Sequence, residues 1–406
     1  MGFQQGLSGL NVAAKNLDAV GNNVANASTV GFKSARAEFA DAYASAAGAA
    51  ASTQIGIGAT VAAVRQQFTQ GNITTTQNPL DVAINGTGFF RLSTNGAISY
   101  SRNGQFSLDK NGYIVTNGGA RLTGYPADAS GNVVQSAPTD LKMSFSDMSP
   151  QPTSEVLLSL NLDAGVAVHP PFNVNDPTTY ESTAMTVYDS LGNAHSLTLY
   201  FSKTSANTWS VRGALDGSLA NVSPNPMVPP LTFNSSGALT AAVTLTPSLT
   251  LTNGAATPQN LNIEFAVGQV TQFAAPFAVN QLQQDGYKPG SLAGFSIGPD
   301  GMVLARYTNG QTRAQGQIVL ANFVNPQGLA PQGGNQWVET SESGQPVIGA
   351  PGTAQLGTLQ SGALEESNVD LTEELVKMIT AQRIYQANAQ TIRTQDQIMQ
   401  TLVNLR

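Results

Sequence analysis

Cysteine and histidine, side chains that serve as nucleophiles, bases and metal ligands, are nearly missing from this sequence. Cysteine is absent and histidine occurs only as His169 and His195. Without cysteine there is no disulfide, zinc-thiolate site or thiol nucleophile. Both histidines lie in segments typical of loops and turns, without the short spacing that places two imidazoles on one helix face. We therefore expect structural or surface roles for both, and the sequence does not favour a Ser-His-Asp triad.

Three glycine-containing motifs resemble known binding loops but are incomplete. Gly56-Ile-Gly58 and Gly86-Thr-Gly88 lack the third glycine and the later acidic residue of a dinucleotide-binding loop. Asp109-Lys-Asn-Gly112 begins like a calcium loop, but Ala120 occupies the position of its distal glutamate. Tight turns explain all three. The sequence therefore predicts no catalytic residue, cofactor or metal, although two carboxylates could still meet in space.

The low charge content favours close packing between copies of the chain. Charged residues make up 11% of the 406 residues, against roughly 25% in an ordinary globular protein. The net charge of −7 is small for this length, so identical copies repel one another poorly. No basic patch suited to nucleic acid stands out.

The sequence gives no sign of membrane insertion or of a cleaved leader. It has no run of about 18 apolar residues. Its first ten residues lack the basic and apolar regions of a signal peptide. We expect that, if the protein is extracellular, it leaves the cell by a route that does not cut the N-terminus.

A helical pattern occupies the N-terminal end of the chain. Apolar and small residues recur at alternating three- and four-residue steps, which is typical of a narrow coiled-coil seam and predicts a helix of about five turns. These residues are Leu7, Leu10, Ala14, Leu17, Gly21 and Val24.

A longer helix is predicted at the C-terminal end. Asp370 followed by Glu373 is typical of a capping box. Residues 371–405 contain no glycine or proline, which predicts one helix roughly 50 Å long. Polar residues interrupt its apolar stripe, so the helix should be marginal alone in water. The stripe consists of Leu371, Met378, Tyr385, Ile392 and Met399, beside Leu375, Ala389 and Val403.

Between the helices, the sequence is typical of β-structure. Short β-branched and aromatic runs are separated by Asn-Gly and Asp-Gly turns, which is a hairpin pattern. Residues 145–284 carry a net charge of −6, from eight acidic and two basic residues, and we interpret them as an inserted outer β-domain. The predicted fold class is α+β, mainly β, with nested discontinuous domains. Its other parts are a coiled-coil-like inner helical domain (1–26 and 366–406), an extended linker (27–70) and a discontinuous β-domain (71–144 and 285–358).

The apolar stripes of the two helices have two interpretations. They are either the contact of a helical hairpin with its own domain, or a surface left exposed until neighbouring copies cover it. Since the linker offers no apolar region to bury them, we favour a head-to-tail polymer that grows as a helical filament. The predicted polymerisation interface consists of Leu7, Leu10, Leu17, Val24, Leu371, Leu375, Met378, Tyr385, Ile392 and Met399.

Four segments of the sequence match motifs of one family. Residues 17–33 and 364–388 form a motif near each end, and residues 77–90 and 100–106 belong to the flanking β-segments. Together they resemble the flagellar axial proteins of rod and hook. The matching residues of the N-terminal motif include Asn22, Asn23, Asn26, Gly31, Phe32 and Lys33.

The resemblance implies a structural role in the bacterial flagellum. Phe32, where many rod proteins have tyrosine, and the large inserted domain favour hook over rod. A hook subunit of this family is implied to polymerise into a curved, flexible universal joint that transmits motor torque to the filament. The resemblance further implies an extracellular location and type III export without cleavage. Implied partners are other copies of the chain, the distal rod protein, the hook cap and the hook-filament junction proteins, without nucleic acid or membrane insertion.

Two alternatives stay open at the level of the sequence. The first is a distal rod protein, which belongs to the same family. The second comes from another class and is a secreted β-sandwich hydrolase or glycan-binding module. It would need a pocket with convergent carboxylates or exposed aromatic residues near Trp209 or Trp337.

Overall fold

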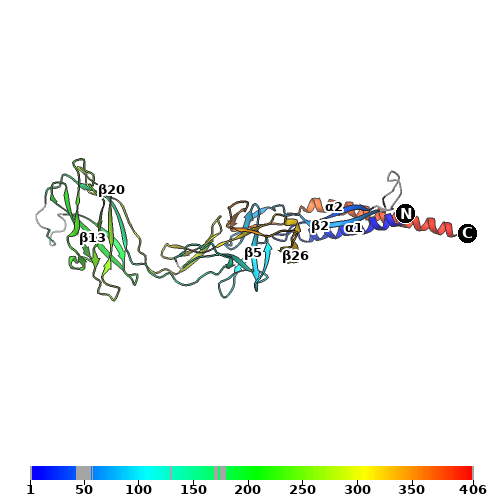
Figure 1. Ribbon diagram of the computed structural model, residues 1–406, viewed down its shortest axis with the longest axis horizontal. Helices are drawn as coiled ribbons and strands as arrows, with labels where there is room; N and C mark the ends of the chain where they lie inside the picture. The colour runs from blue at the N-terminus through cyan, green and yellow to red at the C-terminus, as the bar shows by residue number, and fades with distance from the viewer. Residues whose placement is uncertain are drawn as a thin grey trace. The chain divides into compact units, whose positions relative to one another are not determined.

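The computed structural model describes residues 2–42, 56, 58–128, 130–168, 172–173 and 180–404. The chain forms two compact units: unit 1 contains residues 1–145, 294–306 and 312–406, and unit 2 contains residues 146–293 and 307–311. Both units are rich in β-strands. The two α-helices of the described residues lie at the ends of the chain, in unit 1 (Figure 1). This confirms the predicted mainly β fold with N- and C-terminal helices.

Both terminal helices form where the sequence predicts them. α1 spans Gly2–Ala25 and α2 spans Leu371–Asn404. The carboxylate of Asp370 accepts hydrogen bonds from the backbone amides of Thr372 at 2.8 Å and Glu373 at 3.2 Å, so it caps the first turn of α2. The predicted capping box would place the Glu373 carboxylate on the Asp370 amide, but this carboxylate pairs with Lys377 at 2.8 Å. Within the described residues, no helix is long and apolar enough to cross a membrane.

α1 and α2 lie side by side within unit 1 (Figure 1). Glycines of α1 face α2: a Cβ atom built on Gly6 would lie 3.0 Å from Cγ1 of Ile392, and one on Gly9 would lie 2.7 Å from Oδ1 of Asn388. The distance between packed helices depends on the side chains at their contact. The glycines therefore let the two helices approach closely.

The described part of residues 27–70, the segment predicted as an extended linker, contains two strands. β1 (Ala35–Ala42) and β2 (Gly58–Gln66) form an antiparallel pair. Residues 43–55 and 57 lie outside the described residues.

This strand pair contacts α1. Ser8 Oγ accepts a hydrogen bond from the amide of Ala59 at 3.3 Å, and Gln5 Nε2 donates to the carbonyl of Gly56 at 2.7 Å. Ala37 of β1 is buried. Small side chains are poor anchors for a separate core, but they suit a strand pair that lies close against a helix.

The remaining strands of unit 1 include β3 (Ile73–Thr75), β4 (Val82–Asn85), β5 (Phe89–Thr94), β6 (Ala97–Ser101), β7 (Phe106–Leu108), β8 (Ile114–Thr116), β9 (Arg121–Pro126), β10 (Thr139–Asp140), β22 (Leu292–Ile297), β23 (Met302–Tyr307), β24 (Thr312–Ile318), β25 (Leu320–Asn322), β26 (Ala330–Gly333), β27 (Gln336–Val338), β28 (Val347–Gly349), β29 (Thr358–Ser361) and β30 (Ala363–Glu365). Most belong to one sheet with the order β22-β23-β24-β9-β5-β6-β27-β26. β10, β25, β28, β7 and β8 attach to it at the sides. The pairs β29-β4 and β3-β30 join the early and late segments of the chain.

Turns of the predicted kinds connect these strands. Asn95-Gly96 joins β5 to β6, and both residues have positive φ, as in a type I′ hairpin turn. Between β7 and β8, Oδ1 of Asp109 accepts hydrogen bonds from the amides of Asn111 and Tyr113, each at 2.8 Å. The segment that mimics a calcium loop is therefore a tight turn.

Unit 2 is a β-sandwich. Its strands include β11 (Glu155–Asp163), β12 (Glu181–Tyr188), β13 (Ala194–Ser205), β14 (Thr208–Leu215), β15 (Val222–Ser223), β16 (Met227–Thr232), β17 (Val243–Leu245), β18 (Ser248–Leu249), β19 (Gln259–Asn260), β20 (Asn262–Phe273) and β21 (Ala278–Gln284). One sheet has the order β17-β20-β11-β21 and another β12-β13-β14-β16, with a small sheet β15-β18-β19. Residues of both larger sheets share one hydrophobic core, which includes Leu158, Phe201, Trp209 and Phe265.

Candidate functional site

Three charged residues are buried together in unit 1, and we call them the charge cluster. Lys33 follows α1, Arg102 follows β6, and Glu365 ends β30 just before α2. Lys33 Nζ donates to Glu365 Oε1 at 2.6 Å, and Arg102 Nη1 donates to Glu365 Oε2 at 3.0 Å. The side chains of Lys33 and Glu365 are 0% exposed and that of Arg102 is 5% exposed. The cluster thus joins residues that are 332 positions apart in the sequence.

Backbone carbonyls satisfy further donors of the two cations. Lys33 Nζ donates to the carbonyl of Thr69 at 2.7 Å, and Arg102 Nη2 donates to the carbonyl of Gly86 at 2.8 Å. The Nε of Arg102 is buried without a hydrogen-bond partner. Its guanidinium lies 5.5 Å from the ring centroid of Phe89, which favours a cation there.

Glu365 is the acceptor around which the cluster is organised. Besides both cations, the amide of Gly71 donates to its Oε1 at 2.9 Å. The amide of Gly31 donates to its backbone carbonyl at 2.8 Å. Burial lowers the pKa of Lys33 and of Arg102, while the charge and hydrogen bond of Glu365 oppose the fall in both cases. Because a buried ion is costly unless it is paired, Glu365 is what holds the two cations inside.

Asn23 connects α1 to both β1 and α2. Its Oδ1 accepts a hydrogen bond from the amide of Ala35 at 2.8 Å, and its Nδ2 donates to the carbonyl of Ala35 at 2.8 Å. The same Nδ2 donates to Glu374 Oε2 at 3.1 Å. Both side chains are buried, and Lys377 Nζ pairs with Glu374 Oε1 at 2.9 Å. The end of α1 is therefore fixed to the start of α2.

The other residues of the N-terminal motif have local roles. Asn26 Nδ2 donates to the carbonyl of Asn22 at 2.9 Å at the end of α1, and Phe32 is buried. Gly31 has a φ of 69°, and a Cβ atom there would lie 2.6 Å from the backbone nitrogen of Asn103. Only glycine fits this position without strain.

Sequence reasoning missed Arg102, Glu365 and Asn368 as site residues. Asn368 Oδ1 accepts from the amide of Ser34 at 2.8 Å, and its Nδ2 donates to the carbonyl of Gln67 at 2.7 Å. No local signal identifies Glu365, because a charged residue that ends a short strand is usually exposed to solvent. Nothing in the sequence distinguishes Asn368 from an exposed polar residue.

The predicted interface residues of α1 are only partly covered by the chain itself. Leu7 is 44% exposed, while Leu10, Leu17 and Val24 are half-buried. Phe3, which the predicted stripe does not include, is 52% exposed. An apolar surface along α1 is therefore open to further contact.

α2 exposes more apolar surface than its predicted stripe. Of the stripe residues, Leu371, Leu375, Tyr385 and Met399 are exposed, whereas Met378 and Ile392 are half-buried. Exposed residues outside the predicted interface are Val376, Ile379, Ile384, Ile398 and Val403. We call Leu371, Leu375, Val376 and Ile379 the outer face of α2, since they cover its first turns. The heptad pattern thus identified apolar positions without separating those that face α1 from those that face solvent.

A hollow of about 410 Å³ opens between α1, β1 and the start of α2. Ala19 and Val20 of α1, Phe39 of β1 and Lys377 of α2 are among its lining residues. Phe39 is 41% exposed. Apolar side chains of α1 and β1 therefore meet charged side chains of α2 around one surface depression.

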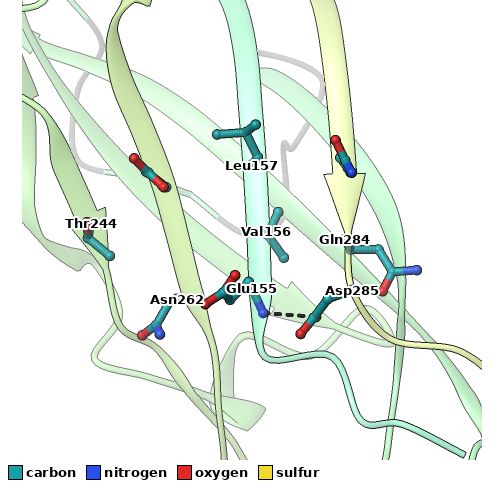
Figure 2. A pocket seen from close by; sticks show the side chains of 9 residues that line it. Glu155, Val156, Leu157, Thr244, Asn262, Gln284 and Asp285 are labelled. Atoms are coloured by element: carbon teal, nitrogen blue, oxygen red, sulfur yellow. Dashed lines mark hydrogen bonds between the residues drawn. The ribbon is translucent and has the colours of Figure 1, made fainter. Parts of the chain in front are cut away.

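A second hollow, of about 500 Å³, lies on the sheet β17-β20-β11-β21 of unit 2 (Figure 2). Glu155, Glu264 and Asp285 line it, so carboxylates do gather there. Oδ1 of Asp285 accepts from the amides of Ser154 at 2.8 Å and Glu155 at 2.9 Å. Although burial raises the pKa of Asp285, such hydrogen bonds outweigh it and lower the pKa. Asp285 is thus an ionised acceptor that holds the start of β11. Within the described residues, no group of three or more acidic or histidine side chains could hold a metal ion.

Both tryptophans named for the glycan-binding alternative are buried. Trp209 is 1% exposed, and its Nε1 donates to Gln272 Oε1 at 2.8 Å. Trp337 is 2% exposed, and its Nε1 donates to Gln66 Oε1. A buried indole cannot stack against a sugar, so neither residue supports that alternative.

His195 lies between two carboxylates of unit 2. Its Nδ1 is 2.7 Å from Asp216 Oδ2, and its Nε2 is 3.3 Å from Asp189 Oδ2. Burial lowers the pKa of His195, but its hydrogen bonds to Asp216 and Asp189 outweigh burial and raise it. The imidazole joins the ends of neighbouring strands. His169 lies outside the described residues.

The fold and the site define a structural protein in which buried polar contacts fix two terminal helices that expose apolar surface. Four stretches of the chain match family profiles. Residues 3–33 match the flagella basal body rod protein, 83–150 the flagellar hook protein FlgE/F/G D1 domain, 161–287 the flagellar basal body protein FlaE D2 domain and 360–405 the flagellar basal body rod FlgEFG protein C-terminal region.

Relatives that align over the whole length of the chain identify its family within the flagellar proteins. The chain is 44% identical to the flagellar hook protein FlgE of Salmonella typhimurium over 412 aligned residues, which cover 100% of both chains. It is 33% identical to the flagellar hook protein FlgE of Borreliella burgdorferi, covering 99% of this chain and 98% of that one. The chain therefore belongs to the flagellar hook protein family, which is structural and acts in motility. This confirms the prediction that the chain is a hook protein and not a rod protein.

A solved structure shows the same fold. The crystal structure of the Helicobacter pylori flagellar hook protein FlgE2 has a TM-score of 0.51 at 14% sequence identity. The match covers 72% of this chain and 99% of that one. At this identity, the likeness shows the fold alone.

Proposed function

We propose that the chain polymerises through its terminal helices into the curved, flexible hook that couples the flagellar motor to the filament. The observation that carries this is the apolar surface exposed on both helices, at Leu7, Leu375 and Ile379. Since these side chains are already about half-buried, covering the rest of one of them with a neighbour contributes about 0.7–1.5 kcal/mol. Because the contact repeats between identical chains, a head-to-tail arrangement extends as a helical tube.

In the polymer, the terminal segments 1–26 and 366–406 form the inner, coiled-coil-like domain. The β-segments 71–144 and 285–358 and the inserted residues 145–284 lie outside it. Small residues at the contact of α1 and α2, such as Gly6 and Gly9, support this arrangement, since they allow a compact helical pair. The apolar residues that this pair leaves exposed then face neighbouring copies.

Assembly completes the ordering of the helices. α2 has an interrupted apolar stripe, and its exposed residues include Met399 and Val403 near its C-terminal end. A helix of this kind gains most of its stability from packing. Neighbouring copies therefore supply the contacts that a single chain lacks, and polymerisation is linked to folding.

The partners and location follow the family. The subunit leaves the cell through the flagellar type III export apparatus without cleavage and is extracellular. Besides its own copies, it contacts the distal rod protein below, the cap protein during growth and the hook-filament junction proteins above.

A double variant tests whether the outer face of α2 drives polymerisation. In Leu375→Ser/Ile379→Ser, both apolar residues are replaced on one face of the helix. The matched control is Val324→Ser/Val347→Ser, which removes two exposed valines, 88% and 59% exposed, from the β-part of unit 1. Sedimentation and electron microscopy of the purified chains measure the polymerised fraction.

We expect the wild-type chain and the control to form tubes, and the α2 variant to stay in the supernatant with its β-structure intact. Polymerisation of the α2 variant at the wild-type concentration would overturn the proposed interface.

A further inference from the structure

We propose that the charge cluster of Lys33, Glu365 and Arg102 is a lock, through which the N-terminal and C-terminal segments dock on the β-part of unit 1 only together. It deepens the proposed function and rests on it, because the docked helices carry the polymerisation surface.

The three members of the cluster come from three separate segments. Lys33 belongs to the segment after α1, Glu365 to the segment before α2, and Arg102 to the β-part of unit 1. Glu365 alone touches both of the others, at 2.6 Å and 3.0 Å. Removing the C-terminal segment from this arrangement therefore removes the partner of both cations.

The two ends of the lock are not equivalent. Without Glu365, Lys33 and Arg102 would be two buried positive charges with no carboxylate between them, which strongly disfavours docking of the N-terminal segment. Without Lys33, Arg102 and Glu365 still form a balanced ion pair. The charges therefore predict that loss of Glu365 is far more damaging than loss of Lys33.

Neighbouring contacts carry the coupling into the helices. Asn368, three residues after Glu365, accepts from the amide of Ser34 at 2.8 Å. Asn23, near the end of α1, donates to Glu374 of α2 at 3.1 Å. These bonds place α1 and α2 with respect to each other once the cluster has formed. The apolar surfaces of both helices are then positioned to contact neighbouring copies. In a chain with one undocked terminus, neither surface is positioned for that contact.

Four full-length variants test the lock: Glu365→Gln, Lys33→Met, the double variant Lys33→Met/Glu365→Gln, and the control Glu366→Gln, whose side chain is exposed. The first readout is the critical concentration for polymerisation. Glu365→Gln should raise it by at least about tenfold, which corresponds to 1.4 kcal/mol. Lys33→Met should raise it less, the double variant should recover part of the loss because one buried cation is gone, and Glu366→Gln should match the wild type.

The second readout is amide hydrogen exchange of the soluble full-length chain, which does not depend on polymerisation. In Glu365→Gln, amides of residues 31–34 and of α1 should exchange faster although the substitution lies in the C-terminal segment. Exchange that rises only near residue 365 would overturn the lock, as would faster exchange throughout unit 1, including the β5-β6 hairpin. A double variant no better than Glu365→Gln would also overturn it.

The two readouts separate the lock from the proposed function. If the wild-type chain does not polymerise at all, the proposed function fails, while hydrogen exchange still decides whether the termini dock together. If polymerisation depends on the outer face of α2 but not on Glu365, the proposed function stands and the lock fails.

Discussion

The side-chain amide of Asn23 in α1 donates to the carboxylate of Glu374 in α2 at 3.1 Å, and both side chains are buried. The same amide donates to the carbonyl of Ala35 at 2.8 Å. A single neutral donor thus connects the end of the first helix, the start of β1 and the first turn of the last helix. Asn23 belongs to the N-terminal motif of the family, and these hydrogen bonds show that it connects α1 to β1 and α2.

Asn23→Asp should destabilise unit 1 by about 3 kcal/mol. The new carboxylate would face Glu374, and the carbonyl of Ala35 would lose its donor. Thermal unfolding followed by circular dichroism at 222 nm measures the effect. Asn22→Asp is the control, since Asn22 is exposed one position earlier on the same helix. Equal losses in the two variants would show that the contact with Glu374 is unimportant.

The close contact of α1 with α2 predicts a size limit at Gly9. A Cβ atom at this position would lie 2.7 Å from the side chain of Asn388, which can move aside for a methyl group but not for a leucine. Gly9→Ala should therefore be nearly neutral, whereas Gly9→Leu should separate the helices and cost about 1–3 kcal/mol. Helical content and thermal unfolding are the measurements.

Gly21 provides the control for this size limit. It lies in the same helix with no atom within 4 Å of its built Cβ. Gly21→Ala should stabilise α1 by about 0.5–1 kcal/mol, because alanine has less backbone freedom to lose. If Gly9→Leu is as well tolerated as Gly21→Ala, the helices do not pack through their glycines.

Gly31→Ala should be more damaging than the same change at another glycine with positive φ. Gly31 has a φ of 69°, and its added Cβ would lie 2.6 Å from the backbone nitrogen of Asn103. Gly119 has a φ of 80° with nothing within 4 Å. Gly119→Ala therefore measures left-handed strain alone, about 1–2 kcal/mol, and Gly31→Ala adds a backbone clash. Comparable unfolding temperatures for the two variants would contradict the close approach of Gly31 to Asn103.

The elements with local signals could be predicted from the sequence. The cap at Asp370 and the absence of glycine and proline after it specify α2, and Asn95-Gly96 specifies a hairpin. The strand pair β1-β2 was missed because its alanine-rich strands have no clear alternation of apolar and polar residues. What stabilises it is contact with α1, through residues such as Ser8, and such a contact leaves no periodic signal.

The site was predictable only in part, for a related reason. Periodicity finds Leu375 and Ile392 as apolar helix positions, but only the packing shows that Leu375 is exposed while Ile392 meets Gly6. Within the charge cluster, Lys33 and Glu365 lie 332 positions apart in the sequence. No local pattern encodes a contact of this range, so Glu365 and Arg102 could be recognised only once the fold brought them to Lys33.

The His195 cluster predicts that unit 2 loses stability as the pH rises above neutrality. The pKa of His195 is raised above its usual value of 6.5 by Asp216 and Asp189, against the effect of burial. A histidine with a raised pKa in the folded state contributes its stability fully below pH 6.5 and loses it as the pH rises through the folded pKa.

The pKa of Asp189 and of Asp216 is lowered by their hydrogen bonds, against burial. Their contributions are present above pH 3.8 and are lost as the pH falls below it, so the cluster stabilises unit 2 most between these limits.

Thermal unfolding of unit 2 between pH 5 and pH 9 checks this, with the fluorescence of the buried Trp209 as the probe in a Trp337→Phe background. His195→Gln should remove the part of the stability loss of unit 2 that occurs as the pH rises above 6.5. Glu181 titrates in an overlapping range, because burial raises its pKa to about 7, and it also destabilises unit 2 as the pH rises. The comparison is therefore made in Glu181→Gln chains with and without His195. If the pH profile keeps its slope above pH 6.5 after His195 is replaced, the imidazole is not the group that makes unit 2 sensitive to pH.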